Sequence, residues 1–274
     1  MLTPDEISRI ERRISARSLT ELSVEDTAAI AAQTGASLKD VQWCALDKKI
    51  VPLRYRRNLG TFGFDGEKKL LESTVIVCGL GGLGGYVIEQ CARAGVGTII
   101  GVDYDVFDET NLNRQILSAG DTLGEKKADV AKKRIEKVNP AVEFKPFSCK
   151  FADMDETCWS NADAVFDCLD SIPEKMILAE KCASHNIPMI HGAIAGWYGQ
   201  VAVIRPGSKI LEIIYKGQKT GIESETGTPP FTAAATAGIM TAKGIKILAG
   251  KEAEKKEQIL FFDLMENDWQ TIDL

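Results

Sequence analysis

The chain has 274 residues, 45% of them hydrophobic, and a formal net charge of -6. This length suits one large domain, or one domain with a small appendage. An acidic chain of this kind is not expected to be a general nucleic-acid or membrane-surface binder. No apolar run approaches the ~20 residues of a membrane span, and the N-terminus lacks the apolar core of a signal peptide. These features predict a soluble cytoplasmic protein with no membrane partner.

The cysteine content also fits the prediction of a cytoplasmic protein. The chain has seven cysteines, an odd number, and no C-x-x-C pair, so reduced thiols are expected and a four-thiolate zinc site is not. The seven are Cys44, Cys78, Cys91, Cys149, Cys158, Cys168 and Cys182.

Residues 1–50 are predicted to form a separate helical module. Apolar residues recur at helical spacing in 4–16, Ser23 is placed to cap a second helix, and Gly35 breaks the chain before Ser37 opens a third. The turn resembles a helix-turn-helix. The would-be recognition helix is of mixed charge in an acidic protein, which favours a docking or dimerisation module over DNA binding.

Three arginines follow in the segment R-Y-R-R-N, residues 54–58. The ordinary interpretation of such a cluster is a solvated charge run. A short helix over 67–71 is expected to lead from this segment into the first strand of the main domain, which we assign to residues 51–274.

The main domain opens with an apolar strand over 74–78, a glycine turn (GLGGLG, 79–84), a helix, and a second strand that ends at Asp103. This order is typical of the βαβ unit of a nucleotide-binding fold. The first glycine permits the tight turn, the second lets backbone N–H groups approach a phosphate, and the third lets the helix pack closely. A carboxylate at the position of Asp103 ordinarily binds ribose hydroxyls.

The rest of the chain predicts an α/β protein. Parallel elements come first: a helix over 123–138, strands over 142–146 and 163–167, a helix over 175–184 and a strand over 187–190. Strands over 199–204 and 209–215 then follow without an intervening helix, which indicates antiparallel additions. A loop over 216–230, a helix over 232–249 and strands over 258–264 and 269–272 complete the chain. The predicted fold is a Rossmann-like doubly wound mixed sheet with a small all-α extension.

A G-x-G-x-x-G turn alone most often indicates a dinucleotide enzyme, but the chain offers no catalytic histidine for one. His185 and His191 are interpreted as structural. Several polar residues that a nicotinamide enzyme does not need instead follow the strands, where loops converge around the glycine turn. They are Asn111, Arg114, Gln115, Lys127 and Asp170.

These residues belong to motifs that resemble the ThiF/MoeB/HesA family, the bacterial relatives of ubiquitin-activating E1 enzymes. The resemblance covers about residues 53–264 and leaves out the first 50. The motifs are R-Y-R-R-N (54–58), G-L-G-G-L-G (79–84), A-G-V-G (94–97), D-x-D followed by N-L-N-R-Q (103–115), L-G-E-K-K-A (123–128), D-C-L-D-S (167–171) and G-Q-V (199–201).

The resemblance implies a reaction in which ATP and the C-terminal glycine carboxylate of a small ubiquitin-like sulfur carrier give an acyl-adenylate and pyrophosphate. The carrier would be ThiS- or MoaD-like, end in Gly-Gly, and serve the synthesis of a sulfur-containing cofactor such as thiamin or molybdopterin. A carboxylate attacking a phosphate brings two anions together, so the site must neutralise charge.

The resemblance also assigns roles. Arg114 and Lys127 would neutralise the phosphates, Asn111 would position the α-phosphate, and Asp170 would hold Mg²⁺. Lys127 is preferred to its neighbour because the family pattern G-x-x-K counts from Gly124. Asp103 would bind ribose. The other residues expected around ATP are Gly79, Gly81, Gly82, Leu83, Gly84, Asp105, Gln115 and Leu169.

Arg57 matches the arginine that, in this family, reaches the γ-phosphate from the neighbouring subunit. The resemblance therefore implies a homodimer with shared sites.

The chain departs from the family pattern in two important places and in a third, milder one. It has no cysteine after Cys182, so no zinc site is expected. In the crossover loop, Phe231 lies near the position where many members carry a transfer cysteine, so later chemistry is expected to pass to another protein. Asp170-Ser171 replaces the usual Asp-Asn.

Two other hypotheses stay open. A relative could adenylate a non-protein carboxylate, as in the cyclisation of tRNA threonylcarbamoyladenosine, although that would favour a basic surface. The protein could also be a nucleotide-binding regulator whose N-terminal helices bind a partner.

Overall fold

The N-terminal region forms three short helices in the computed structural model, which describes residues 2–17, 19–251 and 257–274. The helices are α1 (Pro4–Ser15), α2 (Val24–Thr34) and α3 (Leu38–Asp47). Ser23 and Ser37 cap the second and third helices through their side chains, and Gly35 ends α2 in the left-handed conformation. The predicted caps and break are confirmed.

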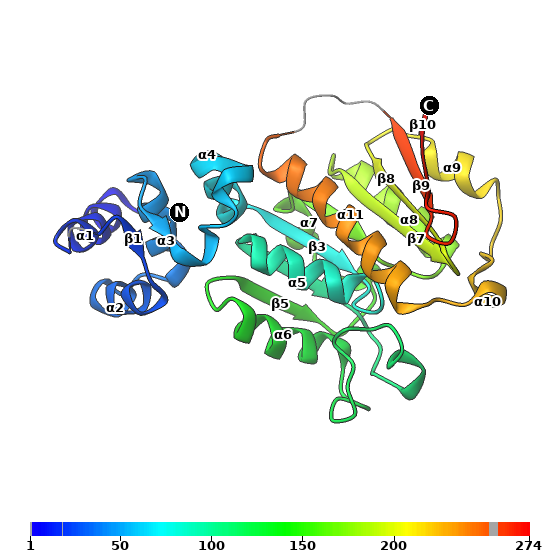
Figure 1. Cartoon of the computed structure of the whole chain (residues 1–274), viewed down its shortest axis with the longest axis horizontal. Helices are drawn as coiled ribbons and strands as arrows, with labels where there is room; N and C mark the ends of the chain where they lie inside the picture. The colour runs from blue at the N-terminus through cyan, green and yellow to red at the C-terminus, as the bar shows by residue number, and fades with distance from the viewer. Residues whose placement is uncertain (1, 18, 252–256) are drawn as a thin grey trace.

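These helices bury a core of their own, made of Ile10, Ile14, Leu22, Ile30, Ala31, Val41, Cys44 and Ala45. Figure 1 shows them at one end of the molecule, beside α4 (Leu59–Glu72). Trp43 on α3 donates a hydrogen bond to Glu72 on α4 at 2.5 Å. A small parallel ladder joins β1 (Glu21–Leu22) to β2 (Val51–Pro52), across the predicted boundary at residue 50. The division into two domains stays a prediction.

The main sheet has eight strands among the described residues, in the order β10-β9-β8-β7-β6-β3-β4-β5. Strands β3 to β7 run parallel, and β8, β9 and β10 add in antiparallel fashion. Their bounds are β3 (Thr74–Cys78), β4 (Thr98–Val102), β5 (Glu143–Phe147), β6 (Ala164–Asp167), β7 (Met189–Ala195), β8 (Tyr198–Ile204), β9 (Gln258–Asp263) and β10 (Asp268–Asp273). The predicted mixed sheet is confirmed.

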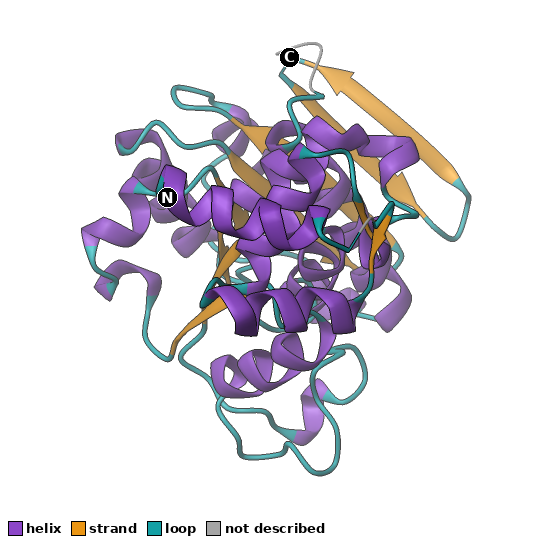
Figure 2. Ribbon diagram, turned by 90° about the vertical axis from the view of Figure 1, so that its left-hand side faces the viewer, coloured by secondary structure: helices purple, strands orange, loops and turns teal. Residues whose placement is uncertain are grey.

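Helices cover both faces of this sheet (Figures 1 and 2). Alternate residues of β3 enter two different cores, as the two-residue period of a strand requires: Val75 and Val77 on one face, Ile76 and Cys78 on the other. The first face packs against α5 (Gly84–Ala94), α6 (Lys127–Val138) and α11 (Pro230–Leu248). The second packs against α7 (Glu156–Ser160), α8 (Ile172–Ser184) and α9 (Ile210–Tyr215).

The remaining elements are short. Three 3₁₀ helices, η1 (Leu53–Tyr55), η2 (Glu109–Asn111) and η3 (Phe151–Asp153), lie in connections, and α10 (Glu223–Thr226) lies within the predicted loop. No helix in the described part of the chain is long and apolar enough to cross a membrane.

The structure corrects one predicted element. Residues 209–215 were predicted to form a strand but form α9. Buried Ile210, Leu211 and Tyr215 fall on one side of a helix and leave Ile213 exposed, so the apolar run has a helical and not a two-residue period.

Some predicted helix boundaries also differ. Helix α6 begins at Lys127 and not at 123, because Gly124 has a φ of 82° and belongs to a turn. Helix α4 extends back to Leu59 across a kink at Gly63, and α8 begins at Ile172 behind a Ser171 cap.

Candidate functional site

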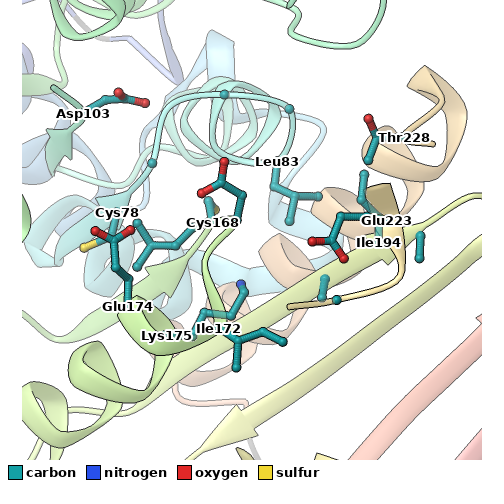
Figure 3. Close-up of a pocket in the computed structure, with 18 of the residues that line it drawn as sticks. Cys78, Leu83, Asp103, Cys168, Ile172, Glu174, Lys175, Ile194, Glu223 and Thr228 are labelled. Carbon is teal, nitrogen blue, oxygen red and sulfur yellow. The ribbon is translucent and has the colours of Figure 1, made fainter. Parts of the chain in front are cut away.

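A cavity of about 520 Å³ lies at the carboxyl ends of β3, β4 and β6. This volume falls within the range of small-molecule sites, and the position is where open α/β sheets bind ligands. Figure 3 shows Asp103 and Glu223 on opposite sides of the cavity, with Cys168 and Leu83 between them. We divide it accordingly. The glycine-turn half is lined by Gly79, Gly81, Gly82, Leu83, 103–105, Arg114, Gln115, Lys127 and 168–170. The other half, which we name the arm half after the chain segment 216–229, is lined by Tyr198, Gln200, Tyr215, Gln218, 221–223 and Thr228.

The glycine turn is held by close backbone contacts. Gly79 has a φ of 88°, and a Cβ there would lie 2.6 Å from the carbonyl oxygen of Cys168. A Cβ on Gly84, the first residue of α5, would lie 1.8 Å from the carbonyl oxygen of Gly79. Only glycine lets strand, turn and helix come this close. At its glycines the turn consequently presents backbone atoms to the cavity.

Asp103 fixes the turn from the end of β4. Its Oδ2 accepts the amide of Leu80 at 2.8 Å, and its Oδ1 accepts the amide of Asp105 at 2.9 Å. Burial raises the pKa of this carboxyl, against the opposing effect of nearby Lys127. Asp103 lines the cavity at the predicted position and has carboxylate lone pairs left to accept hydroxyl groups.

Lys127 is the first residue of α6 and is buried in the cavity wall. Its amide bonds to the carbonyl of Asp105, and its Nζ lies 3.1 Å from Oδ2 of the same residue. Neighbouring Lys126 is exposed and does not line the cavity. Because its acidic partner Asp105 is half-exposed, the buried ammonium of Lys127 can also pair with an anionic ligand in the cavity.

Arg114 and Gln115 stand over the glycine turn. Arg114 Nη1 bonds to the carbonyl of Thr110 and to Asn113 Oδ1, both at 2.9 Å, and forms no salt bridge within the described chain. The buried Oε1 of Gln115 has no hydrogen-bond partner. A buried acceptor without a donor is costly, which fits a group completed by a ligand.

Asp170 follows β6 and reaches the cavity from an exposed position, with Leu169 beside it. It forms no salt bridge with any described residue. Mg²⁺ prefers oxygen ligands and is ordinarily bound by one or two carboxylates plus substrate phosphates, so this donor set fits such an ion. No cluster of three or more metal-ligating side chains occurs among the described residues.

Three predicted residues lie outside the cavity lining. Asn111 is buried in η2, where its Oδ1 accepts the amide of Asp108. Gly84 packs behind the turn. Arg57 is exposed and follows Tyr55, which packs at Gly95, the far end of α5. That helix of 11 residues, about 16 Å long, lies between Tyr55 and the glycine turn. The role of Arg57 at a site stays a prediction.

The sequence analysis missed a buried polar network beneath the cavity. Its centre is Asp167, which accepts from Lys175 at 3.1 and 3.2 Å and lies 2.7 Å from Nδ1 of His191. The other ring nitrogen of His191 lies 3.3 Å from the hydroxyl of Tyr215 and 3.2 Å from Nε2 of Gln200. Burial opposes ionisation of Asp167, but Lys175 and His191 hold its pKa below the usual value.

The sequence held a weak signal for this network. Asp167, Lys175 and His191 are charged or polar residues within otherwise apolar elements, where a buried charge requires a partner. The interpretation of His191 as structural did not identify those partners, since they are 24 residues away on either side.

The chain is similar to known proteins in sequence and in fold. The sequence model of the ThiF family matches residues 55–274. The chain is 30% identical over 232 residues to the SAMP-activating enzyme E1 of Haloferax volcanii, covering 80% of this chain and 84% of that protein. It is 29% identical over 221 residues to the molybdopterin-synthase adenylyltransferase of Escherichia coli, covering 78% and 88%.

Among solved structures, the fold is similar to that of E. coli MccB crystallised with ATP. The TM-score is 0.66 at 20% identity, over 90% of this chain and 82% of that one. PaaA gives a TM-score of 0.67 at 22% identity, over 81% and 72%. At these identities the likeness concerns the fold alone.

Proposed function

The chain belongs to the ThiF family, and on this basis we propose that it is an ATP-dependent adenylyltransferase acting on the C-terminal glycine carboxylate of a ubiquitin-like sulfur carrier. Relatives named for this chemistry include the molybdopterin-synthase adenylyltransferase and the ThiS adenylyltransferase of E. coli, the latter 32% identical over 157 residues. The carrier would enter the synthesis of a sulfur-containing cofactor.

One observation carries the proposal. The glycine-turn half joins a backbone cradle to Asp103, to the buried ammonium of Lys127, to Arg114 and to the unpartnered acceptor of Gln115. Such an arrangement binds a nucleotide by its ribose and phosphates and supplies positive charge where the phosphates lie.

The chemistry is a single displacement. A carboxylate oxygen of the carrier forms a bond to the α-phosphorus, the bond to the bridging oxygen breaks, and pyrophosphate leaves with the electron pair. Lys127 and Arg114 would stabilise the charge that gathers on the phosphoryl oxygens. Bound Mg²⁺, held by Asp170, would neutralise the departing pyrophosphate. No side chain needs to take up a proton, because the nucleophile is already ionised.

The experiment is isotope exchange between pyrophosphate and ATP, with a ThiS-like or a MoaD-like carrier ending in Gly-Gly. The wild-type protein should exchange only when carrier is present, and Asp170→Ala should largely abolish exchange. Undiminished exchange in Asp170→Ala contradicts the metal assignment. Exchange driven by a small carboxylate, with none from either carrier, contradicts the assignment of the substrate.

The same assay tests the dimer. We propose that Arg57 of one subunit completes the site of another, because it is exposed and does not line the cavity of its own chain. Arg57→Ala and Asp170→Ala should each be inactive. Mixing them should restore about a quarter of wild-type exchange, since random pairing leaves half of the dimers mixed, each with one intact site. If mixing restores nothing, Arg57 does not act across an interface.

A further inference from the structure

The buried network described above links the two halves of the cavity. Asp167 Oδ1 accepts the amide of Leu169 at 3.2 Å, within the loop that carries Asp170. Through His191 the same carboxylate is connected to Tyr215, the last residue of α9. Figure 3 shows Lys175, which belongs to this network, beside Ile172 at the edge of the cavity.

The protonation pattern of the network gives each bond a direction. Burial lowers the pKa of His191, although Asp167 opposes the shift, so the ring is neutral near pH 7. Its Nδ1 faces a carboxylate, which can only accept, and therefore carries the proton. Nε2 is then an acceptor, and both the hydroxyl of Tyr215 and Nε2 of Gln200 donate to it. Lys175 has its three donors engaged by Asp167 Oδ1, Asp167 Oδ2 and the carbonyl of Gly192.

Tyr215 lies at the end of α9, where the chain leaves that helix. We call residues 216–229, which run from α9 to α11, the arm. Lys216 turns the chain with a φ of 44°, and the arm then supplies Gln218, Ile222 and Glu223 to the cavity wall.

The far end of the arm is fastened by other bonds. The carbonyl of Gly227 accepts from the amide of Gly196 at 2.7 Å, and that of Thr228 accepts from Asn113 Nδ2 at 3.1 Å. At the near end, the hydroxyl of Tyr215 reaches the buried ring of His191 at 3.3 Å and Nε2 of Gln200 at 3.4 Å.

We propose that Tyr215 is a positioning residue, whose hydroxyl bond to the Asp167–His191 pair fixes the near end of the arm and so shapes the half of the cavity that receives the acyl substrate. This rests on the proposed function only in naming a carrier tail as that substrate. The proposed nucleotide contacts lie in the other half, where the bond from Asp167 to the amide of Leu169 does not involve the hydroxyl of Tyr215.

The first test needs no activity. Trypsin can cut the arm after Lys216 or Lys219, both exposed, in the folded protein. Tyr215→Phe keeps the ring and removes the hydroxyl, and it should speed this cleavage about five- to tenfold, the effect expected from one net hydrogen bond. Tyr86→Phe, on α5 outside the cavity, is the matched control and should cleave like wild type. Unchanged cleavage in Tyr215→Phe overturns the proposal.

The second test separates positioning from general stability. With a ThiS- or MoaD-like carrier, Tyr215→Phe should raise the KM for the carrier about five- to tenfold and leave the Kd of ATP unchanged. An equal loss of ATP affinity, or a carrier KM that stays at the wild-type value, overturns the proposal. If wild type supports no carrier-dependent exchange, the proposed function fails, while the cleavage test still decides the role of Tyr215.

A third variant identifies the partner of the hydroxyl. His191→Asn retains an N–H for Asp167 but loses the acceptor for Tyr215. It should therefore reproduce the cleavage phenotype, and adding Tyr215→Phe should change the rate no further, because both changes break the same bond. If the two changes accelerate trypsin cleavage additively, the hydroxyl acts through a group other than His191. That result overturns the proposed connection from Tyr215 through His191 to Asp167.

Discussion

The two halves of the cavity are built in different ways. The glycine-turn half takes its groups from the ends of neighbouring strands, and many of its contacts are made by backbone atoms, such as the amide of Leu80 on Asp103. The arm half takes its groups from β8, α9 and the arm. It is organised by the side chain of His191 on β7, which meets Asp167 and Tyr215, each 24 residues away in the chain.

The halves differ in charge as well. Lys127 and Arg114 face the glycine turn, and only Lys127 has an acidic partner there. Beneath the arm half, the charge of Lys175 is fully matched by Asp167, and Glu223 adds a carboxylate to the wall. The first half is suited to stabilise an anion that changes during a reaction, and the second to hold a chain in place.

The largest effect should come from removing charge in the glycine-turn half. Lys127→Ala should lower kcat for carrier-dependent exchange by roughly 10²–10³, the usual cost of losing one group that stabilises transition-state charge. Lys126→Ala is the control, since that side chain is exposed and outside the lining. Steady-state exchange at saturating ATP and carrier measures both. Equal losses of kcat in Lys127→Ala and Lys126→Ala would show that Lys127 does not stabilise the transition state.

A second change tests the backbone of the same half. Gly84→Ala would put a Cβ 1.8 Å from the carbonyl oxygen of Gly79, so the turn or α5 must shift. We expect a loss of about 2–3 kcal/mol in the free energy of unfolding, together with weaker ATP binding. Gly120→Ala is the matched control, because a Cβ there meets nothing within 4 Å.

Urea unfolding and equilibrium ATP binding measure these effects, with trypsin cleavage of the arm as the comparison. If the arm of Gly84→Ala is cleaved faster in step with the loss of ATP affinity, the two halves are one cooperative unit and the distinction drawn between them is wrong.

The sequence predicted the glycine-turn half well because its signals are local. The turn, Asp103 and Asp170 each lie next to the end of a strand, and parallel strands bring their carboxyl ends together whatever the distant contacts are. Asn111, which was expected to position the α-phosphate, lies outside the cavity lining and accepts the amide of Asp108 in its own 3₁₀ turn, a local bond that short side chains readily form. Its role at the phosphate stays a prediction.

The arm half was predicted poorly because its signals are long-range. Residues 209–215 were assigned to a strand, although packing against the sheet selects a helix with Ile210, Leu211 and Tyr215 buried. The pairing of His191 with Asp167 and Tyr215 depends on the order of β6, β7 and β8 in the sheet and on the course of the chain after β8. Neither follows from the residues on each side of His191.

The smallest predicted effect is a pH dependence confined to the arm half. The pKa of folded His191 lies below its ordinary value of 6.5, mainly because the ring is buried. Below about pH 6.5 the unfolded chain therefore takes up a proton that the folded chain does not, and stability must fall as the pH falls. Asp167 does not contribute in this range, since its pKa is held below 3.8.

Asp167 and Lys175 are the charged groups that face the ring of His191, and Tyr215 is the other titratable one. The free energy of unfolding of wild type should thus decline from pH 7 to pH 5, by at most about 1.4 kcal/mol per pH unit from this one proton. His191→Asn should lack this part of the decline. His185 is present in both proteins, so its contribution cancels when the two unfolding profiles are compared. Because no group of the glycine turn takes part, ATP affinity should follow the same pH profile in the two proteins. Parallel unfolding profiles would mean that His191 takes up its proton equally in the folded and unfolded chains. The folded ring would then be charged below about pH 6.5, and a charged ring has no acceptor to offer the hydroxyl of Tyr215.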